Sequence, residues 1–282
     1  MASVNSSIRR LVKPLLFRLL GKRGYIYAQV YGKIRDIKHR LVEEKEMVLL
    51  PEFIYKGSQT IDIGANYAYY SERMAQLAGP TGKVWAFEPI PFTHEVCKIV
   101  LRKLKIDNVY LHRLGVSERN EKVTFNIPVM DFGAISAGQS HIAGRNNNSK
   151  EMEDYYVFKN HQQIECEVVK LDDFLMPQLN ELSFVKIDIE GAEIFALKGM
   201  IKIIEKFKPV FLIEVQPLFL KGFEIDANDF YNFIRNEMQY SIYYYDQQKE
   251  KLIPANSFHD NNFILIHNEK VTDFTRLILH EK

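Results

Sequence analysis

Apolar residues in this chain fall into short blocks with two kinds of spacing, and the alternation of these blocks predicts an α/β fold. Runs in which nearly every residue is apolar predict buried strands, whereas apolar positions three or four residues apart predict helices. From Gly57 onward the two kinds alternate, as in right-handed βαβ units, so we expect a mostly parallel sheet. The expected strands are 59–63, 83–87, 109–111, 184–189 and 210–215, and the expected helices are one ending at residue 78 and those at 91–104, 192–207 and 226–237. Two further strands, 240–245 and 262–267, can close the sheet as an antiparallel pair.

The first 50 residues differ in sequence pattern from the rest of the chain. Residues 1–50 read as helical and charged, which predicts an N-terminal extension or lid, and residues 51–282 form the expected α/β domain. Within that domain a polar stretch rich in Gly and Asn separates two more strands, expected at 122–127 and 164–171. We predict that this insertion, residues 128–163, is a mobile loop.

The N-terminal segment has an amphipathic pattern in which apolar residues recur at helical spacing and basic residues lie off the stripe. The apolar positions are Ile8, Leu11, Val12, Leu15, Leu16 and Leu19, and the basic ones are Arg9, Arg10 and Lys13. Pro14 and Arg18 interrupt the run, which argues against the core of a signal peptide. No apolar stretch reaches the roughly 20 residues that span a bilayer. The stripe can pack on its own domain, on a second subunit in a homodimer, or on the periphery of a membrane.

Composition narrows the class of protein. With 46% hydrophobic and 26% charged residues, the chain can bury a sizeable core, which argues against global disorder. The formal net charge of +1 gives no overall positive electrostatic field that would attract nucleic acid, so no nucleic-acid partner is expected. Cys97 and Cys166 stand alone, without the spacing of a zinc site or a disulfide framework, and a cytoplasmic location fits best.

The first chemically informative segment is Asp62-Ile63-Gly64-Ala65-Asn66, a carboxylate at the end of a buried strand followed by a tight turn into a helix. Ligands of open α/β sheets bind at this edge. A dinucleotide-binding turn needs more glycines than the single Gly64 present here, and Asp62 would repel a phosphate. A cationic ligand suits the turn better, and S-adenosylmethionine carries a sulfonium and an ammonium group but no phosphate.

Acidic residues at the ends of two other expected strands point to the same edge. Glu88 closes the strand 83–87, in the place where a carboxylate accepts hydrogen bonds from ribose hydroxyls. In the segment from Phe184 to Ile189, alternation places Lys186, Asp188 and Glu190 on one face of a strand that should be buried. Three charges on such a strand favour a functional site.

These motifs, taken in order, resemble those of the FkbM family of methyltransferases. The segments are DIGAN at 62–66, AFEP at 86–89, LDDF at 171–174 and VKIDIEGAE at 185–193, and the resemblance covers roughly residues 57–216. One departure is Ala68, where the family usually has a second glycine. The resemblance implies a Rossmann-like class I methyltransferase fold, with a seven-stranded, mostly parallel sheet in the order 3-2-1-4-5-7-6, and S-adenosylmethionine as the cofactor.

The resemblance also implies which residues bind the cofactor. Those at the methionine end are Asp62, Gly64, Ala65 and Asn66, with Ser71 within reach of the cofactor carboxylate. Glu88 corresponds to the ribose ligand, and Asp188 lies in the cleft beside the methyl group. Val116 and Ser117, which follow the third strand, would lie near adenine.

The expected reaction is O-methylation of a hydroxyl group on a small molecule or sugar. A hydroxyl acceptor has a high pKa, so a base within hydrogen-bond reach should remove its proton as the bond forms. We favour Asp188 with Glu190, and the other candidates are Glu214 and His141. Asp188 and Glu214 can instead hold Mg²⁺, although no dense carboxylate cluster demands a metal, and no metal site is predicted.

Three rival functions remain open. The chain can be a nonenzymatic module that binds S-adenosylmethionine or a nucleotide-sugar and acts through a partner. A nicotinamide-dependent oxidoreductase is disfavoured because the glycines are missing and Asp62 is present. An RNA methyltransferase is disfavoured by the near-zero net charge.

Overall fold

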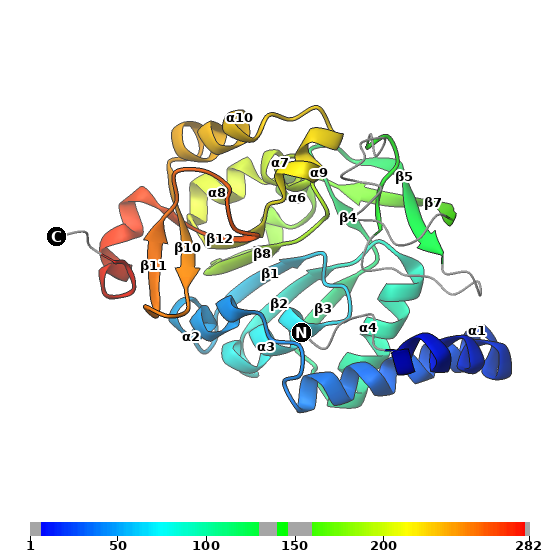
Figure 1. Cartoon of the computed structure of the whole chain (residues 1–282). Coiled ribbons are helices and arrows are strands. Elements are labelled where there is room, and N and C mark those ends of the chain that lie inside the picture. The colour runs from blue at the N-terminus through cyan, green and yellow to red at the C-terminus, as the bar shows by residue number, and fades with distance from the viewer. Residues whose placement is uncertain (1–6, 130–139, 146–159, 280–282) are drawn as a thin grey trace.

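The structure, a computed structural model, describes residues 7–129, 140–145 and 160–279 and is built around an eight-stranded mixed sheet. Figure 1 shows this sheet with helices on both faces. The sheet order is β11-β10-β12-β9-β8-β1-β2-β3, in which β1, β2, β3, β8 and β9 pair in parallel and β10, β11 and β12 pair antiparallel. The strands are β1 Gln59–Ile63, β2 Lys83–Phe87, β3 Val109–His112, β8 Phe184–Ile187, β9 Val210–Glu214, β10 Tyr240–Asp246, β11 Lys251–Pro254 and β12 Asn262–His267.

The seven expected strands occur in the expected order, which is the order of a class I methyltransferase sheet. The expected count was wrong by one strand, because β11 adds an eighth at the edge beside β10. β11 is only four residues long and ends in Pro254, so it has too little alternation for sequence analysis to recognise. A turn in which the Asp246 carboxylate accepts hydrogen bonds from the amides of Gln248 and Lys249 returns the chain from β10 to β11.

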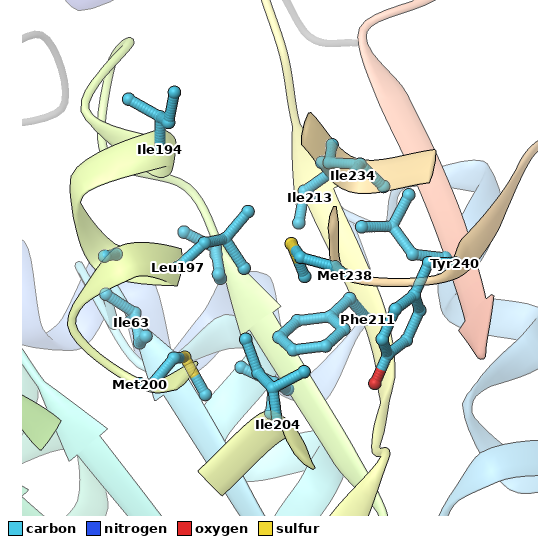
Figure 2. Close-up of a cluster of buried hydrophobic side chains, with 14 of the residues drawn as sticks. Ile63, Ile194, Leu197, Met200, Ile204, Phe211, Ile213, Ile234, Met238 and Tyr240 are labelled. Atoms are coloured by element: carbon cyan, nitrogen blue, oxygen red, sulfur yellow. The ribbon is translucent and has the colours of Figure 1, made fainter. Parts of the chain in front are cut away.

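Alternation of side chains along the strands gives the sheet two buried faces. One face is covered by helices that follow β7 and β8, and its largest hydrophobic cluster contains Ile63, Ile187, Phe211 and Leu197. Figure 2 shows Leu197 from α7 and Phe211 from β9 within this cluster. The opposite face is covered by α2 and α3. The helices from α2 to α10 are α2 Leu50–Phe53, α3 Tyr69–Ala78, α4 Pro91–Leu104, α6 Leu171–Phe174, α7 Glu193–Lys198, α8 Ile201–Phe207, α9 Pro217–Gly222 and α10 Ala227–Asn232.

Two expected elements are shorter in the structure for steric reasons. The helix expected at 192–207 is divided into α7 and α8 at Gly199, where an added Cβ would lie 2.0 Å from the carbonyl oxygen of Ser117. The strand expected at 184–189 ends at Ile187. Glu190 and Gly191 both adopt positive φ angles, so the chain turns sharply beyond the strand and strict alternation does not extend to Glu190.

Residues 128–163 were expected to form a mobile loop, but both ends of this segment belong to a second, four-stranded sheet. Residue 128 lies inside a strand and residue 163 lies inside its antiparallel partner, because Val129 pairs with Asn160. Residues 130–139 and 146–159 of the insertion lie outside the described part of the chain. The sheet order is β4-β7-β5-β6, and the strands are β4 Gly115–Val116, β5 Glu121–Val129, β6 His141–Ile142 and β7 Asn160–Val169.

The N-terminal segment, α1 Ser7–Lys38, consists of two helical stretches that meet at a kink at Gly21, whose φ is 62° and ψ is −175°. The part after the kink packs on α4, and the ring of Tyr25 stacks on that of Phe92 with centroids 6.2 Å apart. The side chains of Ile8, Leu11, Val12, Leu15 and Leu16 lie outside the described residues, whereas Leu19 is 71% exposed. Among the described helices, none combines the length and the apolar character needed to cross a membrane.

We expect Leu197→Ala to lower the free energy of unfolding by about 2 to 5 kcal/mol, because Leu197 is fully buried among the side chains of Figure 2 and its truncation leaves a cavity. Urea denaturation followed by circular dichroism measures the change. The matched control is Leu19→Ala, which should change stability by less than about 0.5 kcal/mol because its side chain is exposed. Equal effects of the two substitutions would contradict the assigned core.

Candidate active site

The turn after β1 is held against β8 by a close backbone approach. Gly64 has a φ of +83°, and a Cβ at this position would lie 2.0 Å from the carbonyl oxygen of Asp188. The amides of Gly64 and Ala65 both donate to the carbonyl oxygen of Phe87 on β2, at 3.0 and 2.9 Å. Only glycine fits at position 64, since both the φ angle and the space exclude a side chain. The turn therefore fixes the ends of β1, β2 and β8 relative to one another.

Asp62 and Ser71 form a buried pair below this turn. Both side chains are fully buried, and the Ser71 hydroxyl donates to Oδ2 of Asp62. Burial raises the pKa of Asp62, while the nearby Lys186 ammonium and the hydrogen bond from Ser71 oppose the increase. Ser71 therefore contacts the carboxylate of Asp62 from the first turn of α3.

Lys186 places a buried ammonium group between two carboxylates. It pairs with Asp62 in the register of β1 and β8, and its Nζ lies 2.7 Å from Oδ2 of Asp188. The same Nζ lies 4.9 Å from the centre of the Tyr70 ring. Burial alone would lower the pKa of Lys186, but the charges of Asp188, Asp62 and Glu44 outweigh it and raise that pKa. Lys186 is therefore a permanent cation at the centre of the site.

Glu88 connects two turns at the end of β2. Its carboxylate accepts hydrogen bonds from the amide of Asn66 at 3.0 Å and from the amide of Ile90 at 2.9 Å. Burial raises the pKa of Glu88 to about 7, although both hydrogen bonds favour the charged form. The side chain predicted to bind ribose thus also holds the Asn66 turn in place.

A cavity of about 200 Å³ lies above these residues, at the carboxyl ends of β1 and β8. Its lining includes five of the residues predicted to bind the cofactor, namely Asp62, Gly64, Ala65, Asn66 and Asp188. Oδ1 of Asp62 and Oδ1 of Asn66 are buried here and have no hydrogen-bond partner among the described residues. Both atoms are acceptors, so they fit a ligand that brings N–H donors and positive charge.

The remaining wall of the cavity was not predicted from the sequence. Val42 and Glu44 reach it from the segment between α1 and the 3₁₀ turn η1 Lys45–Leu49, and Met47 reaches it from η1 itself. Glu44 accepts hydrogen bonds from the Tyr70 hydroxyl at 2.8 Å and from Nδ2 of Asn262 at 3.0 Å. No local motif marks these residues, because they come to the site only through long-range packing.

Glu190 and Glu214 lie beside Asp188 and form an acidic group with it. Burial raises the pKa of both glutamates, and the negative charge of Asp188 raises them further. A hydrogen bond between the carboxyl groups of Glu214 and Asp188 adds to the effect on Glu214. The backbone carbonyl of Glu190 accepts a hydrogen bond of 2.5 Å from the buried guanidinium of Arg145, a contact that sequence analysis missed.

Seven of the predicted residues are not among those lining the cavity: Ser71, Glu88, Glu190 and Glu214, described above, and His141, Val116 and Ser117. His141 is 1% exposed and lies on β6, where its ring meets that of His161 with centroids 6.1 Å apart. Val116 belongs to the hydrophobic core, and the amide of Ser117 donates to the carbonyl oxygen of Val169. Within the described ranges, no group of three or more His, Cys, Asp or Glu side chains has a metal-binding arrangement.

The raised pKa of Glu88 makes its contribution to stability dependent on pH. Its pKa is about 7 in the folded chain and 4.5 without the fold, so the stabilisation is complete below pH 4.5 and is lost as the pH rises through 7. Glu88→Gln, which does not titrate, should remove this loss. We expect the free energy of unfolding of the wild type to fall relative to that of the variant between pH 4.5 and 7.

Denaturant unfolding over this pH range measures the difference, and Glu95→Gln on the exposed side of α4 is the matched control. The control should follow the wild type at every pH. If the free energies of unfolding of the wild type and Glu88→Gln differ by the same amount at every pH in this range, folding does not raise the pKa of Glu88.

Comparison with known proteins gives related proteins of the same class. The model of the FkbM methyltransferase domain matches residues 62–245. Methyltransferase 1 of Beauveria bassiana is 23% identical over 148 residues, covering 50% of this chain and 57% of that protein. A protein-L-isoaspartate O-methyltransferase of Methanocella arvoryzae is 38% identical over 56 residues, covering 20% of this chain and 30% of that protein. The chain thus spans about half the length, or less, of these relatives.

A similar protein is also found among solved structures. The FkbM methyltransferase of Methylobacillus flagellatus has 16% sequence identity and a TM-score of 0.45, with 85% of this chain and 59% of that chain covered. The family match includes Asp62 and Asp188 and continues beyond residue 216, where the sequence motifs end. Because the family model covers more than half of the chain, the protein belongs to the FkbM family of methyltransferases.

Proposed function

We propose that this protein transfers a methyl group from S-adenosylmethionine to a hydroxyl group of a small molecule or sugar. The observation that carries the proposal is the cavity lined by Asp62, Asn66 and Asp188, in which Asp62 and Asn66 each have a buried acceptor oxygen without a hydrogen-bond partner among the described residues. With Glu44 at its wall, the cavity has three carboxylates and one ammonium, Lys186. This excess of negative charge suits a ligand that is cationic at its amino and sulfonium groups.

The residues of the cavity fit the methionine end of the cofactor. Asp62 and Asn66 would accept hydrogen bonds from its ammonium group, and Gly64, which packs against the backbone of Asp188, holds this turn at the cavity. Glu88 accepts one amide hydrogen bond on each oxygen, and the second lone pair of each can accept from a ribose hydroxyl. When bound, the cofactor supplies an electrophilic methyl group.

The size of the cavity implies that the segment holding Val42, Glu44 and Met47 moves when a cofactor binds. About 200 Å³ is less than the roughly 300 to 1,000 Å³ of typical ligand pockets. The segment is held over the cavity by hydrogen bonds from Tyr70 and Asn262 to Glu44. Met47 is also buried in a hydrophobic cluster, and Lys45 pairs with Asp260 at 2.5 Å, so an outward shift breaks apolar as well as polar contacts.

Asp188 is placed to accept the proton of the acceptor hydroxyl. It lies at the cavity, and its Oδ2 lies 2.7 Å from Nζ of Lys186, which fixes the position of the carboxylate. The neighbouring Glu190 and Glu214 have raised pKa values, so they tend to be protonated and to donate hydrogen bonds to Asp188 rather than repel it. The methyl transfer needs no acid for its leaving group, so its remaining requirements are alignment of the acceptor with the methyl group and exclusion of water.

A nonenzymatic binding module is the second candidate function. The same cavity would then bind the cofactor or a nucleotide-sugar and signal through the segment at its wall, with no proton transfer by Asp188. Measured turnover distinguishes the two functions, because a binding module releases its ligand unchanged.

We expect S-adenosylmethionine and S-adenosylhomocysteine to bind this protein, and NAD not to bind, since Asp62 disfavours a pyrophosphate at the turn. Asp62→Asn should weaken binding of S-adenosylmethionine by about 1.5 to 3 kcal/mol, the usual range for a hydrogen bond to a charged group. Titration calorimetry measures both effects, and Asp229→Asn on the exposed side of α10 is the matched control. Tight binding of NAD, with no binding of S-adenosylmethionine or S-adenosylhomocysteine, would contradict the proposal.

We expect Asp188→Asn to keep the fold and much of the cofactor affinity but to lower the single-turnover rate by about 10²- to 10⁴-fold, because Asn keeps the shape and loses basicity. Rates are measured at saturating cofactor with an acceptor once one is identified. Glu190→Gln, Glu214→Gln and His141→Gln are measured alongside as competing bases. A rate near that of the wild type for Asp188→Asn, with a large loss for His141→Gln, would place the base in the insertion.

A further inference from the structure

One face of α1 after the kink at Gly21 presents an exposed stripe of arginine and tyrosine. Arg23, Tyr27, Tyr31 and Arg35 follow one another at four-residue spacing, and all four side chains are exposed. Residues four apart lie on the same face of a helix. The buried side of the same segment contains Tyr25 and packs on α4, so the stripe faces away from the body of the protein, at the periphery that Figure 1 shows.

The charge of the chain is strongly segregated toward this helix. The first 35 residues contain eight Lys and Arg and no Asp or Glu, although the whole chain has a net charge of only +1. The remaining residues therefore carry seven more acidic than basic side chains. Such segregation gives α1 a local field that the overall charge conceals.

Exposed apolar residues accompany the basic ones. Leu19 is 71% exposed, Tyr31 is 62% exposed and Tyr27 is 48% exposed, all on α1. Tyrosine is enriched at membrane interfaces, where its ring lies among the headgroups, and basic side chains beside it attract anionic lipids. A basic helix with exposed Leu and Tyr has the chemistry of a segment that lies in the plane of a membrane surface.

We propose that α1 docks this protein on an anionic lipid surface through the stripe Arg23, Tyr27, Tyr31 and Arg35. A second copy of the chain is a poor occupant, because a symmetric contact would bring two strongly basic segments together. We favour lipid over nucleic acid because exposed Leu19 can enter the boundary between headgroups and acyl chains, whereas only the rings of Tyr27 and Tyr31 would serve to stack bases.

Vesicle flotation with the full-length protein tests the proposal. The wild type should float with vesicles of phosphatidylcholine and phosphatidylserine at low salt, should be released as salt is raised, and should not float with phosphatidylcholine alone. Replacing both arginines, as R23E/R35E, should weaken binding to the anionic vesicles by about 30-fold or more, at about 1 kcal/mol for each basic residue near the surface. Y27A/Y31A should weaken binding at every salt concentration.

The matched control is R119E/K122E, which changes the net charge equally at exposed positions away from α1 and should keep most of the binding. Circular dichroism and thermal unfolding confirm that each variant is folded. Absence of wild-type binding to anionic vesicles at low salt, or equal binding by R23E/R35E, would overturn the proposal. So would a dimer in sedimentation that requires the stripe, or retention on single-stranded RNA in place of vesicles.

Discussion

The site depends on one electrostatic constraint, the burial of the Lys186 ammonium between carboxylates at the ends of β1 and β8. A buried charge is costly unless it is paired, and Lys186 has Asp188 at 2.7 Å and Asp62 on the adjacent strand. Loss of both carboxylates would leave an unbalanced cation in the core. The pairing therefore fixes the positions of Asp62 and Asp188, and Gly64 completes the arrangement by allowing the backbone of the two strand ends to meet.

The same constraint explains how the wall of the cavity is assembled. The Tyr70 ring covers Lys186 from α3, and the Tyr70 hydroxyl donates to Glu44, which adds negative charge near the ammonium. A single buried cation thus connects the sheet, the first helix after the glycine turn and the segment that follows α1. The arrangement couples the cavity to a segment that comes directly after the exposed basic helix.

Much of the fold could be predicted because most β-strands and helices have strong local patterns. The seven main strands and the ending of α3 at Gly79 follow from alternation and from turn residues, whereas the order of the sheet was implied by the resemblance to the FkbM family. The close packing of Gly199 against the backbone of Ser117 could not be predicted, because the two residues are far apart in the chain. Glu44 and Arg145 were missed for the same reason, since their roles come from tertiary contacts without a local motif. The division into 1–50 and 51–282 stays a prediction.

The most direct test of the account is transfer of a labelled methyl group. The protein is incubated with methyl-labelled S-adenosylmethionine and a cell extract, and the products are separated by mass spectrometry. We predict that label appears on a hydroxyl of a small molecule or sugar, in an amount that grows with protein and time. Recovery of the cofactor unchanged from every fraction would contradict catalysis and leave the binding module, and label found only in RNA would contradict the proposed acceptor.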